Sequence, residues 1–312
     1  MTTPTIITGP AIVTWNGFSY YFKGDLMNLV KRETFKAEVN GAEIDERVKS
    51  QVAEISGIPA SQLDDMAKYW PYGVARIGQP LFDAANLKPL VVIPISGEQI
   101  TYPNAALTHT PDMTLRAGAD ALFGEMTWTC LGDPTKSPTD PAYFRTLAAG
   151  AFAGADFNET QNLSDLYTAA WGGAPYDAML SLDGFILSNP LKLWKAGVDN
   201  FGIVNVILQS MTVLAKFKPA SLTESQIDGL LNTQGPDAIR IGSSFAAAGN
   251  DLVITGSGGA GTLIATLKCV GPRDSLLYYS ATKLRQGEIA FVQRRTWTAG
   301  VANELFTLAL AA

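Results

Sequence analysis

Residues Ala11–Phe18 read AIVTWNGF, and residues Ala178–Phe185 read AMLSLDGF. Each stretch places Asn-Gly or Asp-Gly between two apolar runs. Such a dipeptide is typical of a tight β-hairpin, because both central residues of the turn need a positive φ. Aligning the two turns sets Gly17 opposite Gly184. This pair of stretches predicts a β-rich chain with an internal repeat.

Four further matches follow in the same order along the chain. They are Pro59–Ser61 with Pro219–Ser221, Arg76–Gly78 with Arg240–Gly242, Val92–Ile93 with Val253–Ile254, and Gly124–Met126 with Gly287–Ile289. The spacing between the members of each pair is nearly constant. Five ordered matches at nearly the same spacing indicate two copies of one domain. We expect these copies at 1–132 and 176–312, joined by a linker at 133–175 that is partly helical over 142–171.

A long hairpin is expected in the first copy. Its strands, Val30–Val39 and Glu43–Ile55, flank another Asn-Gly turn at Asn40-Gly41. The inter-subunit part of this arm is expected to comprise Val39, Asn40, Gly41, Glu43, Asp45 and Glu46.

One short helix is expected in each copy. The first is expected at Gln62–Tyr69, and the second at Glu224–Asn232, where Thr223 and Gln226 form a capping-box pattern. Alternating strands close each copy. The predicted fold class is mainly β, with two tandem domains that each consist of two packed antiparallel sheets (a β-sandwich or barrel) and one short helix.

The composition indicates a large core and little affinity for nucleic acid. The chain is 47% hydrophobic and only 17% charged, which suggests that neighbouring subunits cover part of its apolar surface. The net charge of −6 disfavours a phosphate-binding surface. No signal peptide and no membrane span are expected. Cys130 and Cys269 are expected to be buried, reduced thiols, with a disulfide between them as the alternative.

Catalytic groups are few. The single histidine, His109, lies in the polar run LTHTP without a nucleophile motif beside it. The stretch Gly256–Gly261 fits GxGxxG, but a strand-like run follows it where a phosphate site needs a helix, so a β-turn is expected. The acids that follow the Asn40-Gly41 turn are expected to be solvated charges, not a glycosidase pair. We therefore expect no enzyme, no cofactor and no metal site.

Several stretches of the first copy resemble the tail tube (major tail) proteins of long-tailed bacteriophages. These stretches are Gly9–Gly17 (GPAIVTWNG), Tyr20–Asp25 (YYFKGD), Asp45–Arg47 (DER), Lys88–Ile93 (KPLVVI), Asn104–Ala106 (NAA) and Ala121–Trp128 (ALFGEMTW). The second copy has looser counterparts at Arg240–Gly242 and Gly287–Phe291. The resemblance is clearest over residues 9–130.

The resemblance implies a structural virion protein of the phage tail, made in the cytoplasm of the bacterial host. Sheets of neighbouring domains would join into a β-barrel ring, and stacked rings would form a hollow tube that delivers the genome to the host. Tape-measure protein and passing DNA would occupy the lumen, and the tail terminator and distal-tail proteins would sit at the tube ends, with no membrane partner. Rings of this family are six-fold, so two domains per chain imply a homotrimeric, pseudo-six-fold ring.

Acidic side chains are the candidates for lining such a channel, because negative charge repels DNA. We expect Glu33, Glu38 and Asp199 in this role; the alternative is that they face the tube exterior or the joint between rings. A distal-tail or baseplate ring protein of the same fold is a second reading. A third is a β-sandwich carbohydrate-binding module, which would need a cleft with exposed aromatic rings.

Overall fold

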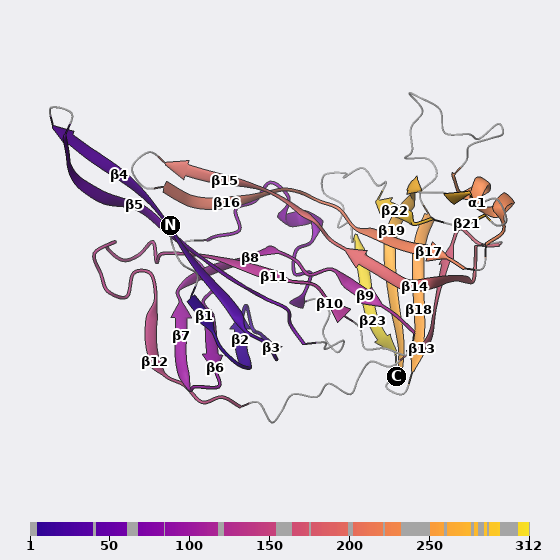
Figure 1. Cartoon of the computed structure of the whole chain (residues 1–312), viewed down its shortest axis with the longest axis horizontal. Coiled ribbons are helices and arrows are strands. Elements are labelled where there is room, and N and C mark those ends of the chain that lie inside the picture. The colour runs from indigo at the N-terminus through magenta and orange to yellow at the C-terminus, as the bar shows by residue number, and fades with distance from the viewer. Residues whose placement is uncertain are drawn as a thin grey trace.

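The computed structural model of the chain is mainly β, with several packed antiparallel sheets. It describes residues 5–39, 42–60, 68–83, 85–117, 122–153, 164–174, 176–198, 202–220, 222–231, 250–258, 261–275, 278–279, 284–285, 287–293 and 305–311. Figure 1 shows an elongated molecule with the first half of the chain at one end and the second half at the other.

Two five-stranded sheets form the first half, in the orders β1-β4-β5-β11-β8 and β12-β7-β6-β2-β3. Their strands are β1 (Thr5–Ile7), β2 (Ala11–Trp15), β3 (Phe18–Phe22), β4 (Leu26–Val39), β5 (Ala42–Gly57), β6 (Leu90–Pro94), β7 (Glu98–Tyr102), β8 (Asn104–His109), β11 (Met126–Leu131) and β12 (Thr146–Ala149). Alternate residues of β2 and β6 are buried, so one face of their sheet packs on the core. Tyr20 and Trp128 meet edge to face between the sheets, with ring centroids 5.1 Å apart.

The second half closes on itself. Its strand β14 pairs with β13 through its first residues and with β17 through its last, so the order β14-β13-β18-β19-β22-β17 returns to β14. The elements are β13 (Ser164–Trp171), β14 (Met179–Ser188), β15 (Leu191–Val198), β16 (Gly202–Met211), β17 (Leu214–Pro219), α1 (Glu224–Leu231), β18 (Asn250–Gly258), β19 (Gly261–Ser275), β20 (Tyr278–Tyr279), β21 (Leu284–Arg285), β22 (Ile289–Gln293) and β23 (Phe306–Ala311).

Three short elements of the first half lead toward the second. They are the 3-10 helix η2 (Val74–Arg76) and the strands β9 (Met113–Leu115) and β10 (Leu122–Phe123). β9 and β10 extend the second half's sheet at β14, although they lie in the sequence between β8 and β11 of the first half.

The long hairpin β4–β5 has a counterpart with the same register. Ala37 pairs with Asp45 in the first half, and Ala196 pairs with Asn205 in the second. The counterpart is built from the end of β14 followed by β15, which together match β4, and from β16 followed by β17, which together match β5.

Both β-bulges of the hairpin recur at the matching positions. The pairing of β4 with β5 shifts at Glu33/Thr34 and at Ala37/Glu38; the shifts in β15 lie at Lys192/Leu193 and Ala196/Gly197. A bulge adds one unpaired residue and sharpens the local twist. The two arms therefore have the same strand register and carry their bulges at the same two positions.

The repeated register extends to the closing strands. β11 pairs with β8 with a bulge between Thr127 and Trp128, and β22 pairs with β19 with a bulge at the matching position, between Ala290 and Phe291. β12 on β7 likewise corresponds to β23 on β19. In the first half Pro103 separates β7 from β8, whereas β19 runs through the same corner without a break.

The turn predicted at Asn16-Gly17 is confirmed. β2 and β3 form a hairpin in which Asn16 and Gly17 both have positive φ, 53° and 83°. The hairpin predicted at Asp183-Gly184 is wrong, because β14 continues through these residues. Gly184, with φ 92°, lies at the register shift where β14 passes from one neighbour to the other. When the register that relates the two arms is extended from β15 back into β14, Gly184 corresponds to Asp25, just before β4. It does not correspond to Gly17, as the sequence alignment had assumed.

The helical part predicted at 142–171, within the linker predicted at 133–175, is wrong where the structure describes it, and residues 154–163 lie outside the described residues. Within 142–153 and 164–174 the secondary structure consists of β12 and β13. β12 pairs with β7 of the first half, and β13 pairs with β14 and β18 of the second. Edge pairing with sheets that are distant in sequence overrides the local helical pattern here. β12 therefore continues a sheet of the first half beyond residue 132, and β13 belongs to the sheet of the second half before residue 176, while the division into two domains stays a prediction.

The other predicted elements fare better. The strands of the long hairpin are confirmed and extend beyond the predicted ends. The second helix is confirmed as α1, and its capping box is present: the Gln226 Oε1 accepts from the Thr223 N–H at 2.7 Å, and the Thr223 Oγ1 accepts from the Gln226 N–H at 3.3 Å. Residues 61–67, on which most of the first predicted helix falls, lie outside the described residues.

Candidate inter-subunit surfaces

The hairpin β4–β5 projects from the first half as an arm (Figure 1). At its tip Val39 pairs with Ala42, and Glu38 pairs with Glu43. Of the residues predicted for subunit contact, Asn40 and Gly41 lie outside the described residues, and so does the predicted lumen residue Asp199. The remaining predicted residues are therefore placed on a projecting arm, and their roles stay predictions.

Charged side chains along this arm pair across its two strands. The Lys31 Nζ lies 2.6 Å from the Glu54 carboxylate. Thr34 Oγ1 donates to Glu46 at 2.5 Å, and Ser50 Oγ donates to Glu33 at 3.2 Å. The Lys31 side chain is exposed and that of Glu54 half-buried, so this ion pair contributes only about 0–1 kcal/mol. Glu33 and Glu46 thus hold cross-strand partners while they face solvent.

The counterpart arm, β15–β16, docks on the first half. Backbone hydrogen bonds join it to the loop 78–82: the Gly78 N–H donates to the Leu208 carbonyl at 2.7 Å, and the Leu208 N–H donates to the Gln79 carbonyl at 3.2 Å. The Asn205 side chain clamps the same loop by donating to the Phe82 carbonyl at 2.9 Å and accepting from the Phe82 N–H at 3.3 Å.

The sequence analysis did not identify this contact. The repeated motif Arg76–Gly78, which stands at the head of the loop, was the available signal. Its second copy, Arg240–Gly242, lies outside the described residues.

Docking changes the burial of matching positions on the two arms. Leu208 is fully buried, whereas its counterpart Val48 is 56% exposed. Val206 is 1% exposed, whereas its counterpart Glu46 is exposed. The same backbone thus carries an apolar, covered surface in one arm and an open, mixed surface in the other.

A second junction joins the halves in the opposite direction. β9 pairs with β14 so that Met113, Thr114 and Leu115 lie opposite Leu187, Ile186 and Phe185. The approach is close, since a Cβ on Gly184 would come within 2.5 Å of the backbone oxygen of Leu115. Met113 and Leu115 are buried in this junction. Around it, Trp70 meets Phe306 edge to face with centroids 4.7 Å apart, and Thr110 donates to the Asn189 carbonyl at 2.6 Å.

The first half uses the same edge position for a different strand. β1 pairs with β4 so that Thr5, Ile6 and Ile7 lie opposite Asn28, Met27 and Leu26. In the register of the arms, these β4 residues are the counterparts of the β14 residues that receive β9. Ile6 and Met27 face each other and are 59% and 43% exposed, whereas Ile7 is buried. β1 therefore covers the edge of β4 in the first half, at the position where β9 covers the edge of β14 in the second half.

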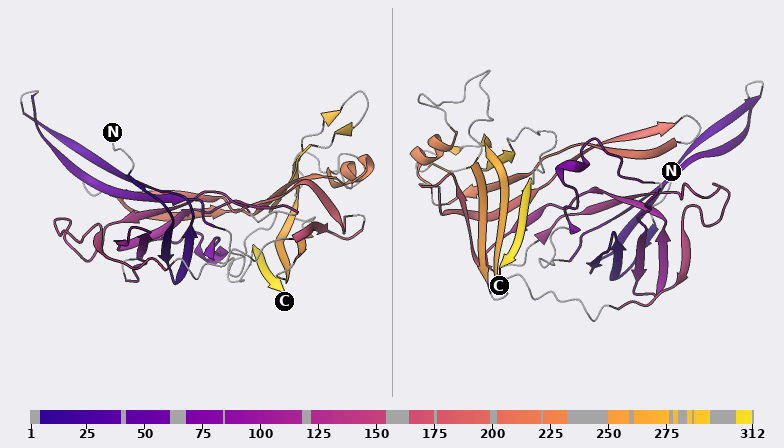
Figure 2. Two further views of the ribbon diagram at one scale, coloured as in Figure 1. Left: turned by 60° about the horizontal axis from the view of Figure 1, so that its bottom comes forward. Right: turned by 180° about the vertical axis from the view of Figure 1, so that it is seen from behind.

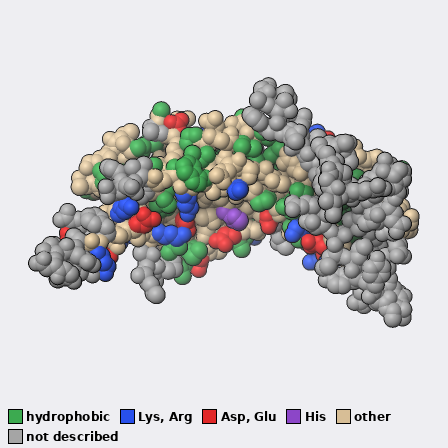
Figure 3. Space-filling view, turned by 90° about the horizontal axis from the view of Figure 1, so that it is seen from above, with side chains coloured by type: hydrophobic (Ala, Val, Ile, Leu, Met, Phe, Trp, Pro, Cys, Tyr) green, Lys and Arg blue, Asp and Glu red, His purple; other side chains and the backbone are tan. Residues whose placement is uncertain are grey.

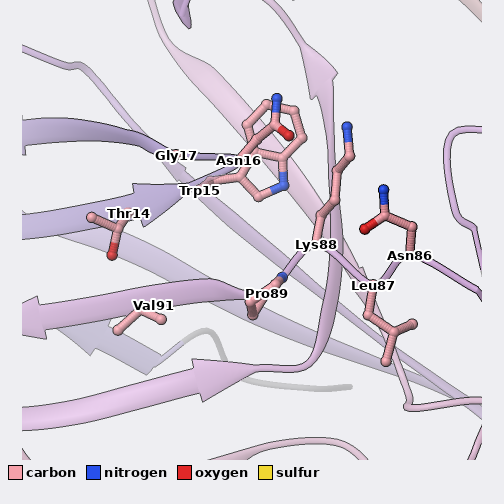
Figure 4. A pocket seen from close by; sticks show the side chains of 9 residues that line it. All are labelled: Thr14, Trp15, Asn16, Gly17, Asn86, Leu87, Lys88, Pro89 and Val91. Carbon is pink, nitrogen blue, oxygen red and sulfur yellow. The ribbon is translucent and has the colours of Figure 1, made fainter.

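A cavity of about 290 Å³ lies beside the β2–β3 turn (Figure 4). It is lined by Thr14, Trp15, Asn16, Gly17, Asn86, Leu87, Lys88, Pro89 and Val91. The Lys88 ammonium sits 5.8 Å from the centroid of the Trp15 ring, and burial, assisted by the charge of Arg76, lowers the pKa of Lys88. Trp15 is only 2% exposed and donates to the Ala105 carbonyl, so it offers no open aromatic face to a sugar.

The candidate chemical groups stand apart from one another. His109 is exposed at the end of β8, and Cys130 is a buried free thiol whose pKa burial raises. The side chain of Cys269 lies outside those that the structure describes. The GxGxxG stretch joins β18 to β19, with Gly258 opposite Gly261, so a strand follows it as predicted. No cluster of three or more His, Cys, Asp or Glu that could hold a metal occurs among the described residues.

The surface carries both signs of charge. On the face shown in Figure 3, acidic and basic side chains lie interspersed among the described residues, with the single histidine among them. Within the described part of the chain no helix has the length and apolarity needed to cross a bilayer.

The arrangement can form contacts between sheets, through the docked arm β15–β16 and the β9–β14 junction. Sequence comparison adds no relative: the chain matches no protein-family model, and no curated protein matches it.

Proposed function

We propose that this chain is a structural virion protein of the tail-tube type, which assembles into rings that stack into a hollow conduit for a phage genome. The observation that carries the proposal is the repeated strand register, with its bulges, in the two halves of the chain. It supports a tandem duplication of one domain. The stretches that resemble tail tube proteins supply the identity of that domain.

The contacts between the halves support assembly by a rotational repeat. Strand β9 of the first half pairs with β14 of the second half, and the arm β15–β16 of the second half packs on the loop 78–82 of the first. Such a contact is heterologous, and heterologous contacts generate rings when the rotation closes. If each half occupies one position of a six-fold ring, three chains complete it. The chain would then need to repeat, between molecules, the junction that it forms within itself.

The open arm supports the same proposal. β4–β5 has the backbone of the docked arm, but within the chain its Val48 and Glu46 face solvent. Sheet edges and projecting strands invite pairing with other chains. Placed in a ring, this arm would reach the neighbouring molecule as β15–β16 reaches the first half.

Electron microscopy with rotational averaging of the concentrated protein tests this proposal. Rings with a central channel, three-fold in strict symmetry and six-fold in outline, are expected, alone or stacked into tubes. Strict six-fold rings of six chains would refute the duplication. Glycan binding by a dispersed monomer, measured by calorimetry against a panel of oligosaccharides, would refute the structural role and favour the carbohydrate-binding alternative.

A further inference from the structure

The hairpin that links the two halves has its own counterpart at the far end of the chain. β10 pairs with β9 so that Leu122 lies opposite Thr114. β21 pairs with β20 in the same way, with Leu284 opposite Tyr279. Tyr279 thus corresponds to Thr114, and Leu284 to Leu122. Each hairpin also follows directly on a corresponding strand, because β9 comes after β8 and β20 comes after the end of β19.

The two hairpins differ in what they pair with. β9 adds to the edge of β14, whereas among the described residues β20 pairs with β21 and with no other strand. Among the described residues no further strand edge receives β20 as β14 receives β9. A two-stranded hairpin alone is at best marginally stable in water, so an acceptor edge would stabilise it.

The matching acceptor edge lies at the other end of the molecule. The counterpart of the β14 residues that receive β9 is Leu26–Asn28 of β4, and β1 covers this edge within the chain. The left-hand view of Figure 2 shows the arm β4–β5 and the gold strands β20 and β21 projecting at opposite ends. A donor at one end and an acceptor at the other permit head-to-tail association, and two donors or two acceptors would not.

We propose that β20 of one molecule pairs with β4 of the next, opposite Leu26–Asn28, and that β1 leaves this edge when the molecules join. The partner is thus a second copy of this chain, and β1 is a strand that complements its own sheet until a neighbour replaces it. The inference rests on the proposed self-assembly and names the contact through which it proceeds. The intramolecular pairing of β9 with β14 is the template for the register.

The template fixes which side chains should meet. Thr114 lies opposite Ile186 in the β9–β14 junction, and the counterparts of these residues are Tyr279 and Met27. Opposed residues of an antiparallel pair have Cβ atoms roughly 4.5–5.5 Å apart, close enough for a disulfide after a small adjustment. Met27 is 43% exposed and is therefore accessible to an incoming strand.

The experiment mixes full-length Met27→Cys protein with full-length Tyr279→Cys protein under oxidised glutathione, and non-reducing electrophoresis reads out the covalent dimer. Tyr278→Cys is the matched control, because adjacent strand residues face opposite sides of a sheet. We expect at least about a fivefold excess of dimer for the 27/279 mixture over the 27/278 mixture. Cys130 and Cys269 are present in every variant, so each single variant alone measures the background.

A second variant tests the role of β1. Ile6→Cys with Met27→Cys in one chain locks β1 onto β4 when oxidised; we expect rings or oligomers in light scattering after reduction and monomers before it. Equal assembly of the locked and reduced forms would overturn the displacement of β1, and a 27/279 yield no higher than the 27/278 control would overturn the pairing. Rings that form without the 27/279 disulfide would contradict the pairing of β20 with β4 but not the proposed function. Chains that are linked through 27/279 but never close into hollow rings would contradict the proposed function but not the pairing.

Discussion

Replacing Leu208 with alanine should destabilise the protein far more than the same truncation at its counterpart, Val48. Leu208 is fully buried where β16 meets the loop 78–82, and its carbonyl accepts the Gly78 N–H at 2.7 Å. Losing three buried carbons removes about 2.4 kcal/mol of transfer free energy, and the cavity left behind raises the cost to roughly 3–4 kcal/mol. Val48 is 56% exposed, so Val48→Ala should cost only about 0.7 kcal/mol.

The assay is urea unfolding of the dilute, unassembled protein, followed by tryptophan fluorescence. The midpoint should fall for Leu208→Ala with little change in the slope of the free energy against urea, since a similar surface is exposed on unfolding. If the two truncations cost the same within about 0.5 kcal/mol, the docked arm does not stabilise the junction between the halves, and the reasoning from burial fails.

Three further predictions concern single positions. Gly184→Ala should lower the free energy of unfolding by roughly 2–4 kcal/mol, against about 1 kcal/mol for Gly17→Ala, because both glycines have positive φ but only the first has a backbone oxygen of β9 within 2.5 Å of the new Cβ; equal losses in urea unfolding would contradict this. Cys130 should resist iodoacetamide at pH 8 in the folded protein and react after denaturation, because burial raises its pKa, and peptide mass spectrometry would reveal early labelling if the thiol were accessible. Hydrogen bonds from Thr135 lower the pKa of Asp133. Thr135→Val should therefore lower the free energy of unfolding by its full amount at pH 7, and by less as the pH falls below 3.8 through the folded pKa of Asp133. An effect of Thr135→Val that is unchanged at pH 3 in urea unfolding would refute the assignment.

The sequence predicted the fold class and the long strands because their signals are local. Asn16-Gly17 marks a two-residue turn, and Thr223 with Gln226 marks the start of α1; each is satisfied by neighbouring backbone groups. These features depend little on distant parts of the chain. They were therefore predicted at the correct residues.

The errors have a common physical cause. Asp183-Gly184 is a turn dipeptide by composition, but tertiary pairing with β13, β17 and β9 keeps β14 extended through it. The segment 142–171 shows apolar spacing that suits a helix, yet Thr146–Ala149 and Ser164–Trp171 pair with the edges of distant sheets as β12 and β13. Local patterns do not specify which edge is open, and that information lies in the assembled sheets.

The candidate contact surface was predicted only in part. The arm around Val39 was predicted because the turn dipeptide Asn40-Gly41 lies between two long strand-like runs, and its role in subunit contact stays a prediction. The clamp from Asn205 to Phe82 was missed, because its partners are far apart in the sequence and neither has an unusual local pattern. The register that relates β20 to β9 likewise becomes visible only when pairing partners are known.

The matched bulges give the two arms the same backbone curve although their side chains differ. Each bulge bends its strand and sharpens the twist, so arms that bulge at the same two places follow the same curve whatever side chains they carry. The exposed Lys36 and Glu46 lie opposite each other on one arm, and Lys195 and the buried Val206 at the same places on the other. One wall built from both arms would keep an even outline while its charge alternates from one arm to the next.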